Sequence, residues 1–161
     1  MSGTRKVLAI IALLALGIVA ALLLRSTGSA SAIDSPLTIS LRATPGGRST
    51  TVDVGPRDGG HGIGDYTVTT GAPLRALTGN AIAGRLDVVE TILSARASEF
   101  RATAVLGDST IQLDGLMNPR KPTGVLAVTG GTGAYSNARG TASFKIDERS
   151  GAATLTFVLL P

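Results

Sequence analysis

The chain has 161 residues, 21 of them glycine, with no cysteine and only 3% aromatic residues. The absence of cysteine excludes disulfide bonds, thiolate metal ligands and a cysteine nucleophile. The formal charge of +4 is unevenly distributed, because three of the 15 basic residues lie in the first 32 positions and 12 basic residues then face 11 acidic ones. With no basic cluster and no interleaved aromatic residues, we expect no nucleic-acid partner.

Residues 1–32 have the features of a targeting segment. Arg5 and Lys6 precede an uninterrupted apolar run of 18 residues from Val7 to Leu24, and Ala30-Ser31-Ala32 is an A-x-A cleavage pattern. We expect a leader helix that is either a signal peptide cleaved after Ala32 or a retained membrane anchor. In both cases residues 33–161 form the folded domain. The basic start places that domain outside the cytoplasm, secreted or anchored, with membrane contact only through the leader.

The rest of the chain alternates apolar and polar residues with a period of two, which is typical of strands. We predict seven or eight strands, at 33–41, 65–70, 85–93, 98–106, 110–116, 125–129, 141–146 and 153–160. Residues 43–64 are rich in glycine and proline and are predicted to be loop, and Pro73 is predicted to end the second strand. His61, the only histidine, has no second ligand at a suitable spacing, so we expect no metal site. The pattern indicates an all-β barrel or sandwich.

One strand carries a carboxylate in an otherwise apolar row. Leu86, Val88, Glu90 and Ile92 alternate onto one face of residues 85–93. A carboxylate among apolar side chains is suited to acid–base chemistry or to hydrogen bonding with a guest. The alternative is that a bulge shifts the alternation and leaves Glu90 in solvent. Tyr66 is expected either to offer its phenol to the same cavity or to be part of the core.

Residues 125–140 read VLAVTGGTGAYSNARG, a strand followed by a glycine hinge and a second strand. A phosphate-binding glycine loop would need a helix directly after GGTG, and the residues that follow show no helical stripe. The string closely resembles the signature of the allene oxide cyclase and dirigent superfamily, a strand ending in VxGGTGxF or VTGGSGxF that runs into an A(R)G step. GDYTVTTGAPL (64–74) and GNAIAGRLDVV (79–89) match the opening hairpin of that family in order and spacing, so the resemblance covers about residues 64–159.

This resemblance implies a small antiparallel barrel of about eight strands with a central cavity. Allene oxide cyclases fold an unsaturated substrate inside such a barrel, dirigent proteins orient phenoxy radicals, and related bacterial cyclases form spirotetronates by [4+2] cycloaddition. No cofactor is needed under this reading, and the family often forms homodimers or homotrimers. The expected site comprises Glu90 and Tyr66 as catalytic groups and Val88, Phe100, Tyr135, Arg139, Phe144 and Phe157 as substrate-binding residues. For Arg139, which matches the arginine of the A(R)G step, an ion pair with a carboxylate such as Asp65 is the structural alternative.

Three functions remain open from the sequence. The first is a cofactor-independent cyclase or isomerase that folds a hydrophobic, polyketide-like or lipid-like unsaturated intermediate for ring closure. The second is a non-catalytic, dirigent-like or lipocalin-like envelope protein that binds or orients an apolar molecule. The third is a structural or partner-binding barrel with a filled lumen. Hydrolysis by a Ser-His-Asp triad is not expected, since the chain has one loop histidine and no GxSxG motif.

Overall fold

The computed structural model describes residues 35–55 and 62–161. The predicted leader with its cleavage site after Ala32, and the loop residue His61, lie outside these residues. Within the described part the chain forms nine strands and one short 3-10 helix. They are β1 (Leu37–Ala43), β2 (Arg48–Val52), β3 (Tyr66–Ala76), β4 (Ile82–Ser94), β5 (Ala97–Leu106), β6 (Ser109–Met117), β7 (Thr123–Thr132), η1 (Gly133–Tyr135), β8 (Gly140–Ile146) and β9 (Ala153–Leu159). No helix among these residues is long and apolar enough to cross a membrane.

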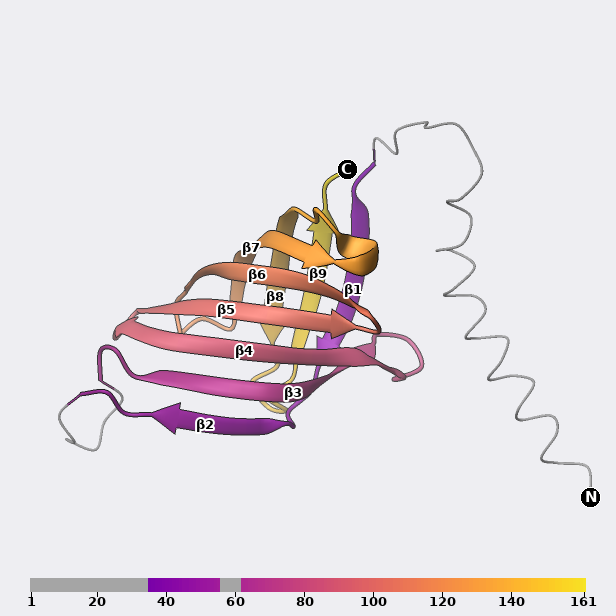
Figure 1. Ribbon diagram of the computed structural model, residues 1–161. Helices are drawn as coiled ribbons and strands as arrows, with labels where there is room; N and C mark the ends of the chain where they lie inside the picture. Colours follow the sequence, from indigo (N-terminus) through magenta and orange to yellow (C-terminus); the bar gives the residue numbers. More distant parts are fainter. Residues whose placement is uncertain (1–34, 56–61) are drawn as a thin grey trace, which may run out of the picture. The chain divides into compact units, whose positions relative to one another are not determined.

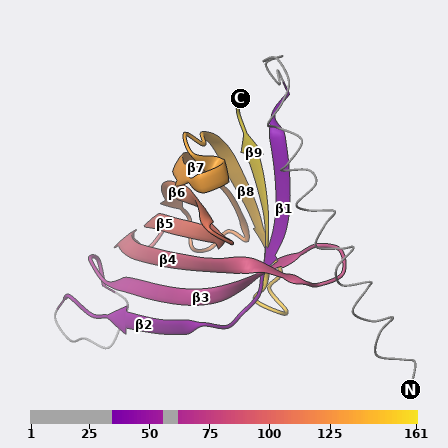
Figure 2. The same cartoon turned by 45° about the vertical axis from the view of Figure 1, so that its right-hand side comes forward.

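The strands form one antiparallel sheet that closes on itself. Their order is β1-β9-β8-β7-β6-β5-β4-β3-β2, and β1 also pairs with β3, so eight strands make a closed barrel and β2 is an additional strand. β3 to β6 lie across one side of the barrel, while β1, β8 and β9 cross behind them (Figures 1 and 2). The all-β, eight-stranded antiparallel barrel predicted from the sequence is therefore confirmed.

β2 lies in residues 43–64, which were predicted to be loop, and that prediction is wrong. Its first four residues are polar and exposed, and only Val52 is apolar, so the alternation signal of a half-buried strand is absent. The strand forms because β3 has an edge to pair with: the register runs from Arg48 opposite Thr70 to Val52 opposite Tyr66. Pairing with an existing strand, and not an apolar face, decides the conformation of this segment.

The prediction that Pro73 ends a strand is also wrong, because β3 continues to Ala76. The carbonyl of Pro73 accepts the N–H of Thr44 at 3.0 Å, on the β1 side of β3. In an antiparallel strand the N–H and C=O of one residue point to the same neighbour. The missing N–H of Pro73 is therefore on the side of β3 that faces β1. This position lies just beyond the last β1–β3 pair, Ala43 with Leu74, so no ladder hydrogen bond is lost. The β3–β4 ladder is left intact.

A β-bulge divides β3. Thr69 pairs with Val88 and Ala72 pairs with Leu86, so three steps on β3 match two on β4. The extra residue is accommodated at Gly71, whose φ of 74° is open to glycine. The N–H of Gly71, displaced from the ladder, donates to the Asp87 carboxylate at 2.7 Å. The bulge shifts the alternation, so Thr67 and Thr69 share the inner face with Ala72 and Leu74.

The middle of the barrel is packed with apolar side chains. Phe157 and Ile111 are fully buried and Leu126 is 2% exposed. The buried apolar cluster draws on β1 and on β3 to β9, and comprises Leu41, Ala43, Leu74, Leu86, Ala102, Ala104, Ile111, Leu113, Leu126, Val128, Ala142, Phe144, Leu155, Phe157 and Leu159. Phe144 and Phe157, predicted to line a pocket, are members of this core. Among the described residues the centre of the barrel is thus filled, which corrects the expectation of a central cavity there.

The glycine hinge has a steric origin. Gly130 and Gly131 belong to β7, Gly133 opens η1, and Gly140 opens β8 with a φ of 140°. A Cβ on Gly140 would overlap the carbonyl oxygen of Val158 on the neighbouring strand. Glycine is required here by close backbone approach and by backbone angle together.

Replacing Gly140 with Ala should lower the free energy of unfolding by about 2 kcal/mol or more, since strain and overlap act together. Gly55→Ala is the matched control, because a Cβ there meets nothing within 4 Å. We expect the control to change stability by less than about 0.5 kcal/mol in urea denaturation. Equal stabilities for the two variants would contradict the steric account of the hinge.

Asp87→Ala should lower the free energy of unfolding by about 1–3 kcal/mol, because it leaves the Gly71 N–H of the bulge without its acceptor. Asp114→Ala is the control: Asp114 lies on the same outer face and forms an ion pair with Arg101 at 3.3 Å, worth at most about 1 kcal/mol at such an exposed position. Urea denaturation of both variants tests the comparison. A loss for Asp87→Ala no greater than for the control would show that the bulge does not depend on this hydrogen bond.

Candidate functional site

Glu90 lies on the inner face of the barrel. The β4–β5 register runs without interruption from Arg85 opposite Val105 to Ile92 opposite Ser98, and the irregularity in this pairing comes only after Ile92. Directly paired residues point to the same face of a sheet. Glu90 pairs with Phe100, and the next inner pair, Val88 with Ala102, leads into the buried core. The alternative of a parity shift that turns Glu90 outward is excluded.

The inner face is covered at one end and accessible at the other. Leu86 is 7% exposed and Ala104 is fully buried, whereas Glu90 and the residues around it are half-buried. The reason is topological: β1 pairs with β3 only opposite Leu74 to Ala76, so the first half of β3 is bordered by β2 instead. We call this accessible part the Glu90 face. It comprises Thr67 and Thr69 of β3, Val88 and Glu90 of β4, and Phe100 of β5.

The polar groups of the Glu90 face differ in how they are held. The Thr67 hydroxyl lies 3.0 Å from the Thr51 hydroxyl, and the Thr69 hydroxyl donates to Ser49 at 3.2 Å. No hydrogen bond or ion pair of Glu90 is found within the described residues. Val88 and Phe100 pack against the buried core. The face therefore presents one carboxylate beside an aliphatic and an aromatic side chain on a rigid sheet.

Tyr66 does not join this face. It pairs with Thr91 and with Val52, and Thr91 is one residue from Glu90 on the opposite side of β4. The sequence interpretation placed Tyr66 inside because Tyr66 and Val68 are the apolar residues of this strand. The bulge at Gly71 reverses that parity, and the threonines face inward. A glycine within a strand pattern was the signal that could have revealed the reversal.

Tyr135 and Arg139 lie at a different end of the barrel. Tyr135 belongs to η1, whose Ala134 N–H donates to the Ser109 hydroxyl at the start of β6 at 3.0 Å. Glu90 and Phe100 are aligned with Gly115, near the end of β6, and Figure 1 shows η1 at the opposite end of that strand. The Arg139 guanidinium donates to the Pro161 carbonyl at 3.0 Å. The carboxylate of Asp65, considered as its partner, accepts the N–H groups of Val54 and Gly62.

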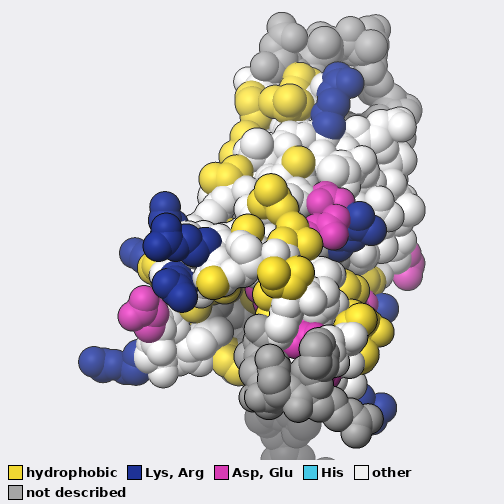
Figure 3. Space-filling model, turned by 90° about the vertical axis from the view of Figure 1, so that its left-hand side faces the viewer, with side chains coloured by type: hydrophobic (Ala, Val, Ile, Leu, Met, Phe, Trp, Pro, Cys, Tyr) yellow, Lys and Arg dark blue, Asp and Glu magenta, His cyan; other side chains and the backbone are white. Residues whose placement is uncertain are grey.

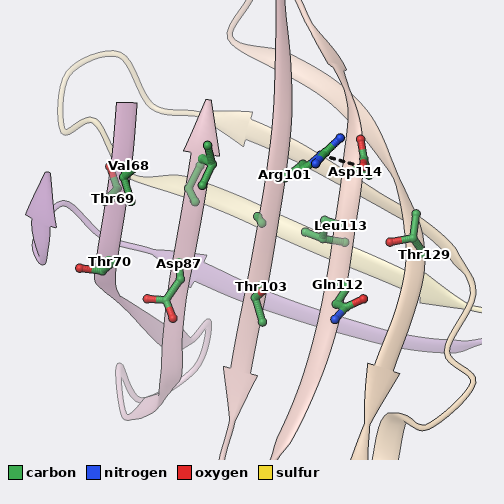
Figure 4. Close-up of a pocket in the computed structure, with 13 residues that line it drawn as sticks. Val68, Thr69, Thr70, Asp87, Arg101, Thr103, Gln112, Leu113, Asp114 and Thr129 are labelled. Atoms are coloured by element: carbon green, nitrogen blue, oxygen red, sulfur yellow. Dashed lines mark ion pairs between the residues drawn. The ribbon is translucent and has the colours of Figure 1, made fainter. Parts of the chain in front are cut away.

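A groove of about 360 Å³ runs over the outer face of β3 to β7. It was not anticipated from the sequence. One row of its lining is formed by Thr70, Asp87, Thr103, Gln112 and Thr129, and a second by Val68, Arg101 and Asp114 (Figure 4). The strand register adds Val89 to the second row, between Val68 and Arg101. These nine residues alternate with four inner-facing ones, Thr69, Val88, Ala102 and Leu113, which complete the lining. Because most of the lining faces outward, the groove lies on the outside of the barrel. Its charged side chains are paired, Asp87 with Arg85 at 3.2 Å and Arg101 with Asp114 at 3.3 Å.

The end of the barrel where β4 turns into β5 presents exposed apolar side chains. In the view of Figure 3, hydrophobic side chains run down the middle of this end, with lysine or arginine side chains on both sides of them. Exposed apolar residues near the ends of β4 and β6 include Leu93 and Leu116, at 42% and 68%.

Among the described residues no group of three His, Cys, Asp or Glu side chains could hold a metal ion.

Comparison with known proteins identifies the class of fold first. No protein-family profile matches the sequence, and no curated protein matches it. Solved structures do match, and they include dirigent proteins and cycloaddition enzymes. The chain therefore has the barrel fold that these dirigent proteins and cycloaddition enzymes share, and the resemblance seen in the GGTG segment is confirmed at the level of the fold.

Three particular structures illustrate the match. A pyocyanin demethylase superposes with a TM-score of 0.65 at 19% identity, covering 76% of this chain and 99% of its own. The pterocarpan synthase dirigent protein GePTS1 gives 0.55 at 21%, covering 78% and 82%. The Diels Alderase AbmU from Streptomyces koyangensis gives 0.58 at 15%, covering 81% and 72%. At these identities the similarity establishes the architecture alone.

Burial raises the pKa of the Tyr135 phenol above its ordinary value of 10.0. The folded state therefore keeps the proton at pH values where the unfolded chain releases it, and stability falls as the pH rises through 10.0 toward the folded-state pKa. Tyr135→Phe should reduce the loss of stability between about pH 8 and pH 11, because the titrating group is gone. Urea midpoints of both proteins at the two pH values provide the test. Parallel losses in the two proteins would contradict it.

Proposed function

We propose that the protein is a cofactor-independent cyclase or isomerase that holds a hydrophobic, unsaturated small molecule on the Glu90 face for intramolecular ring closure. The observation that carries the proposal is the position of Glu90: a carboxylate on the inner face of a closed barrel, paired with Phe100 and next to Val88. The guest is of a polyketide-like or lipid-like class. A [4+2] cycloaddition is the specific reaction that we propose.

Positioning supplies most of the rate in such a reaction. Holding two reactive ends in a near-attack geometry can lower a barrier by about 7–11 kcal/mol at best. Val88 and Phe100 lie where the β4–β5 register is unbroken, between Arg85 and Ile92, so an apolar guest meets a surface of fixed shape. Glu90 then adds a directed polar group, either to exchange a proton or to hydrogen-bond where charge develops.

The names of the structural neighbours support a small-molecule role without selecting the reaction. They are a demethylase of pyocyanin, a pterocarpan synthase dirigent protein and a Diels Alderase. A shared fold can host unrelated chemistry. The choice of cyclase for this chain therefore rests on its own carboxylate and on the apolar residues that flank it.

A non-catalytic, dirigent-like or lipocalin-like envelope protein is the second candidate. The packed barrel centre favours this candidate. The centre is filled by Phe157, Ile111 and Leu126, so a guest would bind on the half-exposed Glu90 face. Such a face excludes water less completely than an enclosed chamber, which suits binding better than catalysis. The extracytoplasmic location expected from the leader agrees with this role. A barrel that serves only as a structural or partner-binding module is the third, and the same packed centre is its support.

The test compares Glu90→Gln with Glu99→Gln. Glu99 lies beside Phe100 on β5 and contacts Arg101 at 2.8 Å on the outer face, so its replacement removes a similar charge away from the Glu90 face. The assay measures ring closure of linear trienes that carry a conjugated carbonyl, and binding of the neutral apolar dye Nile red. We expect Glu90→Gln to lower turnover at least about 10-fold with dye affinity retained, and Glu99→Gln to change neither.

Unchanged product formation by Glu90→Gln would remove this residue from the mechanism. Dye binding without turnover by the wild-type protein would favour the carrier. If the wild-type protein neither binds the dye nor turns over the trienes, the third function, a structural or partner-binding barrel, is favoured. The oligomeric state enters as a separate proposal: we expect a homodimer or homotrimer, as the family resemblance implies, and sedimentation equilibrium of the folded domain measures it.

A further inference from the structure

Ser98 is an anomaly in the wall of the barrel. Its side chain is fully buried, and its hydroxyl has no hydrogen-bond partner among the described residues. An unsatisfied buried hydroxyl costs about 1–3 kcal/mol relative to its removal. Buried polar groups in native proteins nearly always have partners, so this one calls for an explanation.

The register places Ser98 next to the Glu90 face. Ser98 is two residues before Phe100 on β5, so both face the inside, and it pairs with Ile92 and with Met117. Glu90 pairs with Phe100 and is therefore a diagonal neighbour of Ser98. Diagonal neighbours of a sheet have Cα atoms about 7–8 Å apart, within reach of a long side chain. One oxygen atom of a guest can thus lie close to both groups.

The residues that pair with Ser98 are less buried than Ser98 itself. Met117 and Ile92 are only half-buried. Methionine is unbranched and adapts to irregular neighbours at small cost. Since Met117 is the register partner of Ser98 on β6, a new rotamer of Met117 is the route by which we expect a guest on Phe100 to reach the Ser98 hydroxyl.

We infer that Ser98 is a positioning residue whose hydroxyl donates a hydrogen bond to a carbonyl oxygen of the guest, so that the substrate class is a neutral, conjugated unsaturated carbonyl compound. The inference rests on the proposed function. The nearby Glu90 carboxylate disfavours an anionic guest by like-charge repulsion. A hydrogen bond to a conjugated carbonyl withdraws electron density from the adjacent double bond, which activates that bond toward ring closure.

The test uses two probes of matched shape, β-acetylnaphthalene, which carries the carbonyl oxygen, and β-isopropylnaphthalene, which lacks it. Ser98→Ala should weaken binding of the acetyl probe about 5- to 10-fold and leave the isopropyl probe unchanged, as expected for the loss of one hydrogen bond. The same variant should raise the urea midpoint, because an unsatisfied hydroxyl is removed. The control is Ser94→Ala, whose hydroxyl accepts the Arg96 N–H in the β4–β5 turn. It should leave both affinities unchanged.

Opposite effects on stability and on oxygen-selective binding are the signature that a purely structural serine would not produce. Equal weakening of both probes, or of neither, overturns the inference. Loss of turnover in Glu90→Gln together with no oxygen selectivity in Ser98→Ala would overturn it while the proposed function stands. Failure of the wild-type protein to bind either probe would overturn it because the Glu90 face then holds no such guest. Ser98→Cys keeps the size of the side chain and should recover only part of the selectivity, since a thiol is a weak donor.

Discussion

The fold depends on one strand serving two neighbours along the same edge. β3 pairs with β2 over its first half and with β1 over its last residues. Three residue pairs, Leu41 with Ala76, Arg42 with Arg75 and Ala43 with Leu74, close the barrel. The bulge at Gly71 and the proline at position 73 lie where the strand passes from one partner to the other, and each tolerates the break in pairing there.

Because β3 changes partner, one part of the inner face is closely packed and another part is accessible to a guest. Where β1 closes the ring, side chains such as Leu74 and Ile111 are fully buried, and close packing makes that half resistant to change. Where β2 takes the place of β1, the inner face remains half-exposed and carries Glu90. Glu90, which has no hydrogen bond or ion pair among the described residues, lies on this half-exposed part, and the fully buried, unsatisfied hydroxyl of Ser98 lies next to it. Proteins commonly lose some stability at positions that meet a ligand.

Local pairing explains which sequence predictions succeeded. Residues 98–106 and 110–116 were predicted as strands and correspond to β5 and β6, joined by a tight turn at Gly107 with a φ of 59°. The position of Glu90 on an apolar face also followed from alternation alone, because β4 and β5 pair without a bulge over that stretch. The predicted orientation of Tyr66 was wrong because β3 does contain a bulge. The extra residue between Thr69 and Ala72 reverses which side chains of β3 face inward.

The sequence by itself determined the all-β class and the carboxylate in an apolar row, since both depend on alternation within short segments. The choice of a barrel over a sandwich was implied by the family resemblance of the GGTG segment. Only the tertiary structure decided that β2 forms, that Pro73 lies inside a strand, that the barrel centre is filled and that Tyr66, Tyr135 and Arg139 lie away from Glu90. Each of these depends on which strand lies beside which. Pairing between distant segments is set by the closure of the ring and leaves no periodic signal in either segment alone.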